Sequence, residues 1–474
     1  MTQPMPLPPF QVEPRRQVYL GLDPGDGLRR CWSGPEDSVG VIGPPRYGKT
    51  SGLIIPALMS WAGPAVATST RGDLLRFCGG WRAQLAAARG GRIYVYDPFG
   101  SEPGVTGLRW SPLAGCADPA VCYRRVAAMT GVAARGVTDG EHWRTGAAVI
   151  LRGVFHAAAV AGADLAQVRR WLAHQDVRTP ADILRHTDSA ARGWGDDLQA
   201  IELIGERERG SFFSVARNCL DATAEPTVLA STAVTDLDLD HFLATSSTLF
   251  IVGPSHHQDA IAPLIVGLVD SVAQRAAEIA ARSPGGRLAD PLLLALDEVA
   301  NIAPLRSLPS LVSEGGGRGI ITLWAAQSLA QLRARYGTDE QQAILAATTA
   351  KLIYGGMSNG DDLRNISSWA GEFRDPQVTY YAGGEPTPAM LRGPRPGGGL
   401  AGDDVIGRQH AVSGLYRPVL PVEAIQRLPP LHAWLFYRSD APLLVETRPA
   451  GLMEPYRQLA DLPWEARPDA EVPR

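Results

Sequence analysis

Lysine is almost missing from this chain of 474 residues. Of its 45 lysine and arginine residues, only Lys49 and Lys351 are lysine. Together with the 51 glycines, this shortage of lysine indicates a bias in the codons of the gene. A lysine that is present despite such a bias is more informative than usual. A surplus of positive charge is missing as well, because the formal net charge is -4. This charge excludes a surface that coats nucleic acid in bulk, but it is compatible with a local basic channel.

Paired cysteines are also missing. No two of the five cysteines form a Cys-x-x-Cys motif, and their number is odd. They are Cys31, Cys78, Cys116, Cys122 and Cys219. Such a set argues against a disulfide framework and a zinc cluster and favours a reducing compartment. We therefore expect a cytoplasmic protein.

Long hydrophobic runs are missing too. The N-terminus has no apolar run typical of a signal peptide. The longest stretch without Asp, Glu, Lys or Arg, residues 50–70, is interrupted by Pro56, Gly63 and Pro64. A buried helix followed by a strand explains this stretch better than a membrane span does. The sequence predicts no transmembrane helix, so we expect association with the inner face of the cell membrane only through partners.

Short apolar runs recur along much of the chain, as is typical of strands that are buried on both faces of a parallel sheet. They are 38–42, 65–68, 93–96, 248–252, 291–296, 320–326, 351–354 and 433–437. Helical periodicity separates several of them, for example at 48–61 and 262–281. The alternation predicts an α/β fold with a mainly parallel sheet.

Residues 107–245 lack such strand runs and carry apolar residues at helical spacing. The helical stretches are 142–161, 166–173, 197–205 and 211–224, and a further helix is expected to begin at Thr179-Pro180. The sequence predicts an N-terminal segment (1–37), an α/β domain (38–106 and 246–375), an all-helical insertion (107–245) and a C-terminal segment (376–474) whose strands complete the α/β domain. Residues 382–402 are rich in Gly and Pro and are expected to form a mobile loop.

The first apolar run leads into a pattern of chemical importance. It reads Gly43-Pro44-Pro45-Arg46-Tyr47-Gly48-Lys49-Thr50 and fits GxxxxGK[ST], with a strand before it and a helix after it. Backbone N–H groups of this loop, together with Ser51 at the helix start, are expected to surround phosphate oxygens. Lys49 is expected to bridge the β- and γ-phosphates, and the Thr50 hydroxyl to bind Mg²⁺. The pattern predicts a P-loop ATPase that uses ATP and Mg²⁺.

A second apolar run, 292–296, ends in two carboxylates, Asp297 and Glu298. In a P-loop ATPase, Asp297 is expected to hold the magnesium ion through water. Glu298 is expected to orient and deprotonate the attacking water. By themselves the two residues are equally compatible with a pair of solvated acids at a strand end.

Two further polar residues are candidates for catalytic roles. Gln327 ends the apolar run 320–326 and is expected to sense the γ-phosphate, unless it only caps a helix. Arg318 lies in the glycine-rich stretch 315–319, which is expected to be a flexible loop. Its guanidinium could reach a neighbouring subunit's nucleotide, DNA phosphates or Glu314.

Longer segments around these motifs are specific to one family. They are Ile54-Ile55-Pro56-Ala57-Leu58, Val95-Tyr96-Asp97-Pro98, Leu296-Asp297-Glu298-Val299-Ala300-Asn301-Ile302-Ala303-Pro304, Leu308-Pro309, Gly317-Arg318-Gly319-Ile320 and Ala326-Gln327-Ser328-Leu329-Ala330-Gln331-Leu332. Over about residues 17–445, the chain resembles the type IV secretion coupling proteins of the TraG/TraD family, which are ATPases that feed DNA to a conjugation channel.

The resemblance implies a RecA-like P-loop NTPase core with an all-α inserted domain that faces the DNA. It also implies a homo-hexamer around a DNA channel, with a relaxase or DNA-processing complex and type IV secretion components as partners. The chain departs from the family pattern in two respects. It lacks N-terminal transmembrane helices, and the first of two arginines common in the family falls on Gly316, while Arg318 matches the second.

The predicted function is therefore ATP-driven delivery of DNA, or of a DNA–protein complex, to a conjugative type IV secretion channel. An alternative is a DNA-pumping motor of the FtsK/HerA type, and another is a nucleotide-gated adaptor that recruits protein substrates without translocation. Within the insertion, the arginines of Glu206-Arg207-Glu208-Arg209-Gly210, expected to form a turn, are candidates for phosphate contacts. The alternative is a structural cap whose charges are simply solvated.

Overall fold

The computed structural model describes residues 15–133, 140–380 and 410–462. The described residues fall into two compact units, one from Met1–Met357 with Leu428–Arg474 and the other from Ser358–Arg427. The expected domain boundary at residue 375 is therefore wrong. Residues 358–375 leave the larger unit because helix α15 (Gly360–Trp369) packs on α16 (Val422–Gln426), and strand β10 (Glu372–Tyr380) pairs with β11 (His410–Pro418) in a sheet of its own. The expected loop 382–402 lies outside the described residues.

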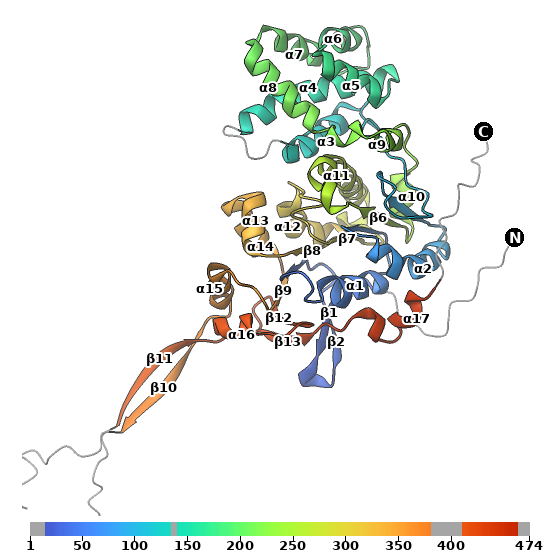
Figure 1. The fold of residues 1–474 in the computed structure, drawn as a ribbon. Coiled ribbons are helices and arrows are strands. Elements are labelled where there is room, and N and C mark those ends of the chain that lie inside the picture. Colours follow the sequence, from blue (N-terminus) through green and yellow to red (C-terminus); the bar gives the residue numbers. More distant parts are fainter. Residues whose placement is uncertain (1–14, 134–139, 381–409, 463–474) are drawn as a thin grey trace, which may run out of the picture. The chain divides into compact units, whose positions relative to one another are not determined.

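The larger unit is built on an 11-stranded sheet in the order β2-β1-β13-β12-β9-β3-β8-β7-β4-β6-β5 (Figure 1). The strands from β9 to β5 in this order run parallel. They are β9 (Ala350–Tyr354), β3 (Val39–Ile42), β8 (Ile320–Ala326), β7 (Leu292–Leu296), β4 (Ala65–Ser69), β6 (Thr248–Val252) and β5 (Ile93–Tyr96). Nearly every residue of these strands is buried, which explains their continuous apolar sequences.

Helices cover both faces of the parallel strands (Figure 1). The chain moves one way along the sheet from β3 through β4 to β5, and the opposite way from β6 through β7 to β8. Because crossover connections are right-handed, helices on these two paths lie on opposite faces. The first path carries α1 (Ile55–Ser60) and α2 (Asp73–Ala87), and the second carries α11 (Gln258–Arg282) and α12 (Leu308–Arg318). The predicted α/β fold is confirmed.

Antiparallel strands extend the sheet beyond β9. They are β12 (His432–Tyr437), β13 (Leu443–Glu446), β1 (Tyr19–Asp23) and β2 (Arg29–Trp32), and the short helix α17 (Tyr456–Ala460) follows them along the chain. The C-terminal strands complete the sheet as expected, but the separation of residues 1–37 from the α/β domain is wrong. A short strand pair with mixed polar residues gives no clear period in the sequence, and its pairing with β13 holds it in place.

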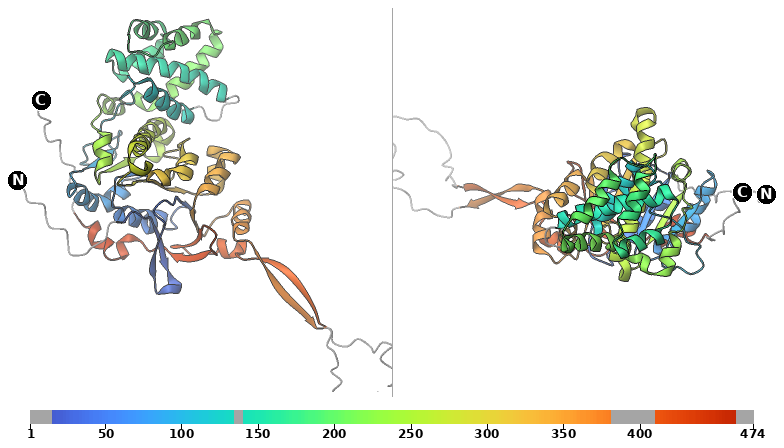
Figure 2. Two further views of the ribbon diagram at one scale, coloured as in Figure 1. Left: turned by 180° about the vertical axis from the view of Figure 1, so that it is seen from behind. Right: turned by 90° about the horizontal axis from the view of Figure 1, so that it is seen from above.

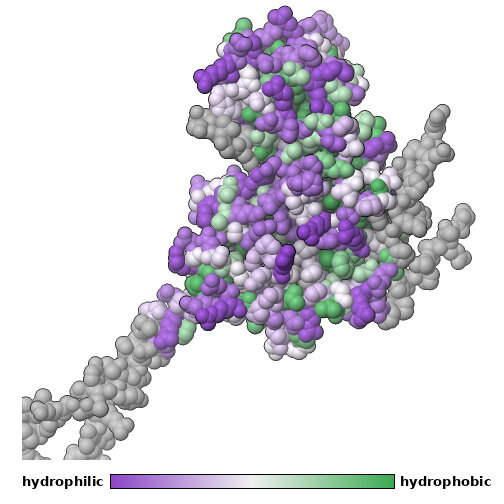
Figure 3. All heavy atoms as spheres, viewed as in Figure 1, coloured by the Kyte–Doolittle hydropathy of each residue, from purple (hydrophilic) through white to green (hydrophobic). Residues whose placement is uncertain are grey.

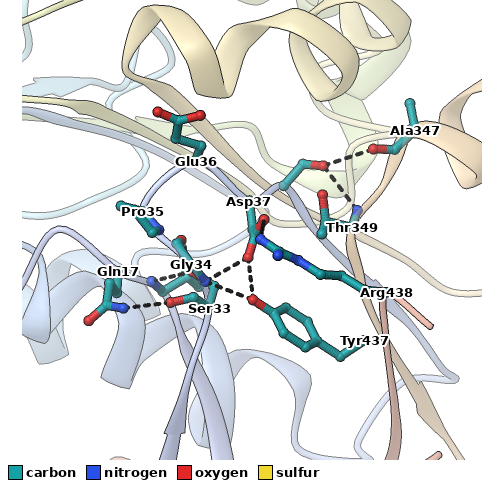
Figure 4. Close-up of polar contacts among 12 residues, drawn as sticks. Gln17, Ser33, Gly34, Pro35, Glu36, Asp37, Ala347, Thr349, Tyr437 and Arg438 are labelled. Carbon is teal, nitrogen blue, oxygen red and sulfur yellow. Dashed lines mark hydrogen bonds and ion pairs between the residues drawn. The ribbon is translucent and has the colours of Figure 1, made fainter. Parts of the chain in front are cut away.

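A buried carboxylate ties the loop before β3 to the end of β12. Asp37 accepts hydrogen bonds from Gly34 N at 2.6 Å, Tyr437 Oη at 2.5 Å and Arg438 Nη2 at 3.0 Å (Figure 4). Burial by itself would raise the pKa of Asp37, but these three hydrogen bonds hold that pKa below its ordinary value. The contacts fasten the C-terminal strands to the edge of the sheet where β3 begins.

Between β5 and β6 the described residues contain helices and no strand, as the predicted insertion requires. The helices are α3 (Pro119–Ala133), α4 (Gly140–Ala161), α5 (Leu165–His174), α6 (Arg178–Arg185), α7 (Trp194–Ala200), α8 (Glu206–Asn218), α9 (Pro226–Ser231) and α10 (Leu239–Ala244). Helix α3 packs on α11, whereas α4–α8 pack mainly on one another and gather away from the sheet (Figure 2). The insertion therefore consists of a layer on the core and a helical lobe, α4–α8.

The expected turn at 206–210 is wrong, because these residues form the start of α8. Glu206 and Glu208 lie in the first turn, where acidic side chains favour a helix through its dipole. Glu208 also accepts a hydrogen bond from His142 at 2.8 Å, if that ring nitrogen carries the proton. The helices expected at 197–205 and 211–224 begin earlier, at Trp194 and Glu206.

The expected glycine-rich loop at 315–319 is also wrong, because residues up to Arg318 belong to α12. Glycine suits this helix because its backbone approaches other backbone closely. A Cβ atom on Gly316 would stand 1.9 Å from the carbonyl oxygen of Glu36. Gly319 ends the helix with φ 81°, a conformation that favours glycine. Packing decides the structure of this stretch rather than flexibility.

Helix α11 and the turn before it, Ser255–Arg282, are long and apolar enough to cross a membrane by length and composition. However, 72% of the apolar window is buried within the protein. The helix packs on α3, α12 and the sheet, so its apolar character is explained by its place in the core. The visible face of the molecule is largely hydrophilic, with apolar residues interspersed (Figure 3).

The smaller unit contains α15 (Gly360–Trp369) and α16 (Val422–Gln426), which pack together, and the ribbon β10–β11. Ser367 Oγ donates a hydrogen bond to the carbonyl oxygen of Leu420 at 2.7 Å and joins α15 to the residues that lead into α16.

Candidate nucleotide-binding site

The loop between β3 and the following helix has the backbone that a phosphate loop requires. Gly48 has φ 98°, a backbone conformation that favours glycine, and a Cβ atom there would also stand 2.5 Å from Leu431 Cδ2. The helix that follows starts as a π-helix, Thr50–Ile54, and continues as α1. Ser51 lies in the first turn of that π-helix. Short π segments of this kind are frequently found at functional sites.

Lys49 is buried and points back over its own loop. Its Nζ donates hydrogen bonds to the carbonyl oxygens of Gly43 at 2.6 Å and Pro44 at 2.9 Å. Burial lowers the pKa of Lys49 below its ordinary value, although the negative charges of Asp297 and Glu298 act in the opposite direction and raise it. The ammonium group thus stands over the phosphate loop, hydrogen-bonded to two backbone carbonyl oxygens.

The phosphate loop and β7 meet through one direct contact. Thr50 Oγ1 donates a hydrogen bond to Asp297 Oδ2 at 2.7 Å. Burial raises the pKa of Asp297 to about 6, the hydrogen bond from Thr50 opposes the shift, and the charge of Glu298 adds to it. A buried carboxylate with a raised pKa beside a hydroxyl is a place where a cation gains much electrostatic energy.

Glu298 and Gln327 lie at the carboxyl ends of neighbouring strands. Strands β7 and β8 pair in parallel with Leu296 opposite Trp324, so the residues that follow them emerge at one edge. Gln327 Nε2 donates a hydrogen bond to Glu298 Oε1 at 3.0 Å. Glu298 has φ 54°, a conformation that is costly for a residue other than glycine and is often found at functional sites. Hydrogen bonds thus join Thr50 to Asp297 and Gln327 to Glu298, and Lys49 adjoins Thr50 in the chain as Glu298 adjoins Asp297.

Comparison with known proteins agrees with this geometry. Residues 12–375 match the model of the family described as type IV secretory system conjugative DNA transfer. The chain belongs to this family. It is 26% identical over 333 residues to a conjugal transfer protein TraG of Escherichia coli, covering 65% of this chain and 51% of that protein. A second TraG protein of Escherichia coli gives the same identity and coverage. The chain thus spans about half the length of the curated relatives it matches.

Solved structures of the conjugative coupling protein TrwB share the fold of this family member. An unbound form has a TM-score of 0.64 at 19% identity and covers 92% of this chain and 89% of that chain. A complex with the ATP analogue ADPNP has a TM-score of 0.63 at 18% identity, covering 94% and 97%. A complex with ADP and Mg²⁺ has a TM-score of 0.62 at 19% identity, covering 96% and 98%. The predicted family and the RecA-like fold with its helical insertion are confirmed.

Arg318 is not brought to this site within one chain. It lies just before β8 begins, whereas Gln327 follows the end of β8, and the 7 residues of this strand separate the two sheet edges by roughly 20 Å. Its guanidinium is exposed and pairs with Glu314 across one turn of α12 at 3.0 Å. A role for Arg318 at the nucleotide therefore requires a second subunit.

Two residues beside Glu298, Asn301 and Gln331, have no catalytic role that the sequence pattern predicts. Asn301 Nδ2 donates a hydrogen bond to Glu298 Oε2 at 3.1 Å. Gln331 Nε2 donates one to Asn301 Oδ1 at 3.1 Å, and Gln331 Oε1 accepts one from Gln327 N at 2.9 Å. The spacing Ser328-x-x-Gln331 is a helix-capping pattern and gives a signal for the helix start, but none for the contact with Asn301.

Proposed function

We propose that the chain is an ATP-hydrolysing coupling protein that delivers DNA, or a DNA–protein complex, to a conjugative type IV secretion channel. The observation that carries this proposal is the 2.7 Å contact between Thr50 and Asp297, with Glu298 and Gln327 directly beside it. In a member of the conjugative DNA transfer family, this arrangement supports nucleotide hydrolysis rather than nucleotide binding alone.

Thr50 after the phosphate loop and Asp297 at the end of β7 fit Mg²⁺. The Thr50 hydroxyl and the Asp297 carboxylate offer oxygen atoms, which this ion prefers, and Asp297 is buried. Thr50 would hold the ion directly and Asp297 through water, and the bound ion would supply positive charge against the phosphates. Lys49, now hydrogen-bonded to Gly43 and Pro44, would donate to the β- and γ-phosphate oxygens of ATP.

Glu298 is the proposed base for the attacking water. Its carboxylate stands at the strand end beside Asp297 and is held by Gln327. Because Gln327 contacts the proposed base directly, it is the proposed sensor of hydrolysis. The backbone N–H groups of Arg46, Tyr47, Gly48 and Ser51 would complete the binding of the nucleotide. Pro45 has no N–H group and would contribute through the shape of the loop.

The proposal includes assembly into a homo-hexamer around the transported DNA, with a relaxase complex and type IV secretion components as partners. The helical lobe α4–α8 is proposed to recognise the substrate. Its elements contain none of the residues at the nucleotide site, and insertions on a rigid α/β scaffold often carry recognition.

ATP turnover without DNA, with single-stranded DNA and with duplex DNA tests the proposal. We expect turnover that rises when one form of DNA is present. Turnover without any stimulation by DNA would favour the nucleotide-gated adaptor, and no turnover at all would contradict the ATPase assignment. Plasmid transfer by a donor cell that carries this chain as its only coupling protein distinguishes a conjugative role from that of an FtsK/HerA-type motor.

A further inference from the structure

Four residues at the carboxyl ends of β7 and β8 form a closed ring of hydrogen bonds, three between side chains and one from the backbone N–H of Gln327. Gln327 Nε2 and Asn301 Nδ2 donate to the two carboxylate oxygens of Glu298, at 3.0 and 3.1 Å. Gln331 Nε2 donates to Asn301 Oδ1 at 3.1 Å, and Gln331 Oε1 accepts from the backbone N–H of Gln327 at 2.9 Å. Each member of the ring therefore depends on the next.

We propose that Asn301 and Gln331 are positioning residues for Glu298, which hold its carboxylate and the Gln327 amide in the arrangement needed for hydrolysis. This inference rests on the proposed ATPase function. Neither residue belongs to the phosphate loop or to the pair of carboxylates, and both act through other side chains.

The direction of every hydrogen bond in the ring follows from one group. An ionised carboxylate only accepts, so Asn301 must present its NH₂ group to Glu298. Its amide oxygen then faces Gln331, which must present its own NH₂ group to Asn301. The oxygen of Gln331 is left to accept from Gln327 N–H. Only this arrangement satisfies all four members, and it fixes the orientation of both amides.

The backbone around Glu298 shows why such support is needed. Glu298 has φ 54°, and its carbonyl oxygen accepts from Asn301 N at 2.9 Å and Ile302 N at 3.1 Å. The same tight turn thus bends the chain and brings the Asn301 side chain back to the carboxylate. Two amide donors, one on each oxygen, fix the plane of the carboxylate in which a water would be held.

Gln331 has a second task that must be separated from the first. Ser328 caps helix α13 (Leu329–Tyr336), and its Oγ accepts from Gln331 N at 3.0 Å. The side chain of Gln331 reaches back to the N–H of Gln327, much as in a capping box. Helix capping uses only the oxygen of the Gln331 amide, whereas positioning of Asn301 uses its nitrogen.

The variant Gln331→Glu separates these two tasks. A carboxylate at position 331 still accepts from Gln327 N–H and suits a helix N-terminus, but it has no hydrogen to donate to Asn301. Asn301→Asp similarly keeps the shape of its side chain and loses the donor to Glu298. The control is Ser328→Ala, which weakens the cap of α13 and leaves the four ring contacts intact.

For Gln331→Glu and Asn301→Asp, we expect kcat to fall by about ten- to a hundredfold, as for other residues that orient a reactive ligand. The affinity for a non-hydrolysable ATP analogue, measured by titration, is expected to stay close to that of the unchanged protein. Ser328→Ala is expected to lower the melting temperature and to retain kcat. The double variant Asn301→Asp/Gln331→Glu is expected to lose no more than the more impaired single variant, since both changes break one ring.

Unchanged kcat in Gln331→Glu and Asn301→Asp would overturn the inference and leave the ATPase function standing. An equal loss of kcat in Ser328→Ala would also overturn it, because helix capping would then explain the effect. Additive losses in the double variant would show that the two residues act separately. If the unchanged protein has no ATP turnover under any condition, the proposed function fails, and this inference fails with it.

Discussion

The hydroxyl of Thr50 lies 2.7 Å from Asp297 Oδ2 and joins the phosphate loop to the end of β7. The two residues are far apart in the chain, and the contact exists because β3 and β7 both pair with β8. It places a hydroxyl and a buried carboxylate where one Mg²⁺ ion would use both.

Thr50→Val removes the hydroxyl and keeps the shape of the side chain. We expect the Mg²⁺ concentration for half-maximal ATP turnover to rise by about tenfold, which corresponds to roughly 1.4 kcal/mol. Thr50→Ser, which keeps the hydroxyl, is the matched control and is expected to behave like the unchanged protein. If this Mg²⁺ concentration is the same in Thr50→Val and the unchanged protein, the ion is bound elsewhere.

Lys49→Ala is expected to abolish measurable ATP binding, with affinity reduced by at least about 100-fold. The ammonium group supplies hydrogen bonds from a charged donor, each worth about 1.5–3 kcal/mol. Nucleotide titration of the purified variant measures the effect. The other lysine, Lys351, is partly buried in β9 and donates to the carbonyl oxygens of Leu345 and Thr348, so Lys351→Met is a control for the loss of a hydrogen-bonded lysine. Equal affinity in Lys49→Ala and the unchanged protein would contradict the phosphate-loop assignment.

Glu298→Gln is expected to bind ATP normally and to turn it over at least about 100-fold more slowly, as expected for the loss of a general base. The change removes the proton acceptor and nearly preserves the size of the side chain. Single-turnover hydrolysis, measured together with nucleotide affinity, separates chemistry from binding. Glu225→Gln changes an exposed acid on the surface and serves as the control. Turnover near that of the control would move the base to another residue.

Arg318 is expected to act on the nucleotide of a neighbouring subunit, since it is exposed and lies at the sheet edge opposite its own site. Arg318→Ala subunits keep a complete phosphate loop, whereas Lys49→Ala subunits keep the arginine. Mixing the two inactive variants is therefore expected to restore part of the ATP turnover. The size of the mixed sample verifies that assemblies form. If they form and turnover stays absent, Arg318 contacts DNA or only pairs with Glu314.

Asp37→Asn is expected to lower the free energy of unfolding by about 1–3 kcal/mol at neutral pH, because a buried carboxylate then loses its charged hydrogen bonds. The folded-state pKa of Asp37 is lowered, so its contribution is complete above the unfolded value of about 3.9 and is lost as the pH falls further. Denaturant unfolding of both proteins at pH 7 and near pH 3 measures this, and the difference between them is expected to shrink at the lower pH. The exposed Asp440 gives the control variant Asp440→Asn. A difference that stays constant with pH would show that the charge of Asp37 contributes nothing.

The sequence by itself determined the features that depend on neighbouring residues along the chain. The phosphate loop between β3 and its helix was predictable because its glycines and Lys49 act within one short segment. The parallel strands were predictable because strands that are buried on both faces must be apolar throughout. The carboxylates at the end of β7 followed from the same strand pattern.

Only the tertiary structure decided the features that depend on contacts between distant segments. Residues 315–318 are helical because α12 packs its glycine backbone against Glu36, although glycine runs ordinarily favour loops. Strands β1 and β2 hold their place through pairing with β13, which no local pattern reveals. The ring that joins Glu298, Asn301, Gln327 and Gln331 depends on the parallel register of β7 and β8, because hydrogen bonds between side chains require positions that are fixed to within a few tenths of an ångström.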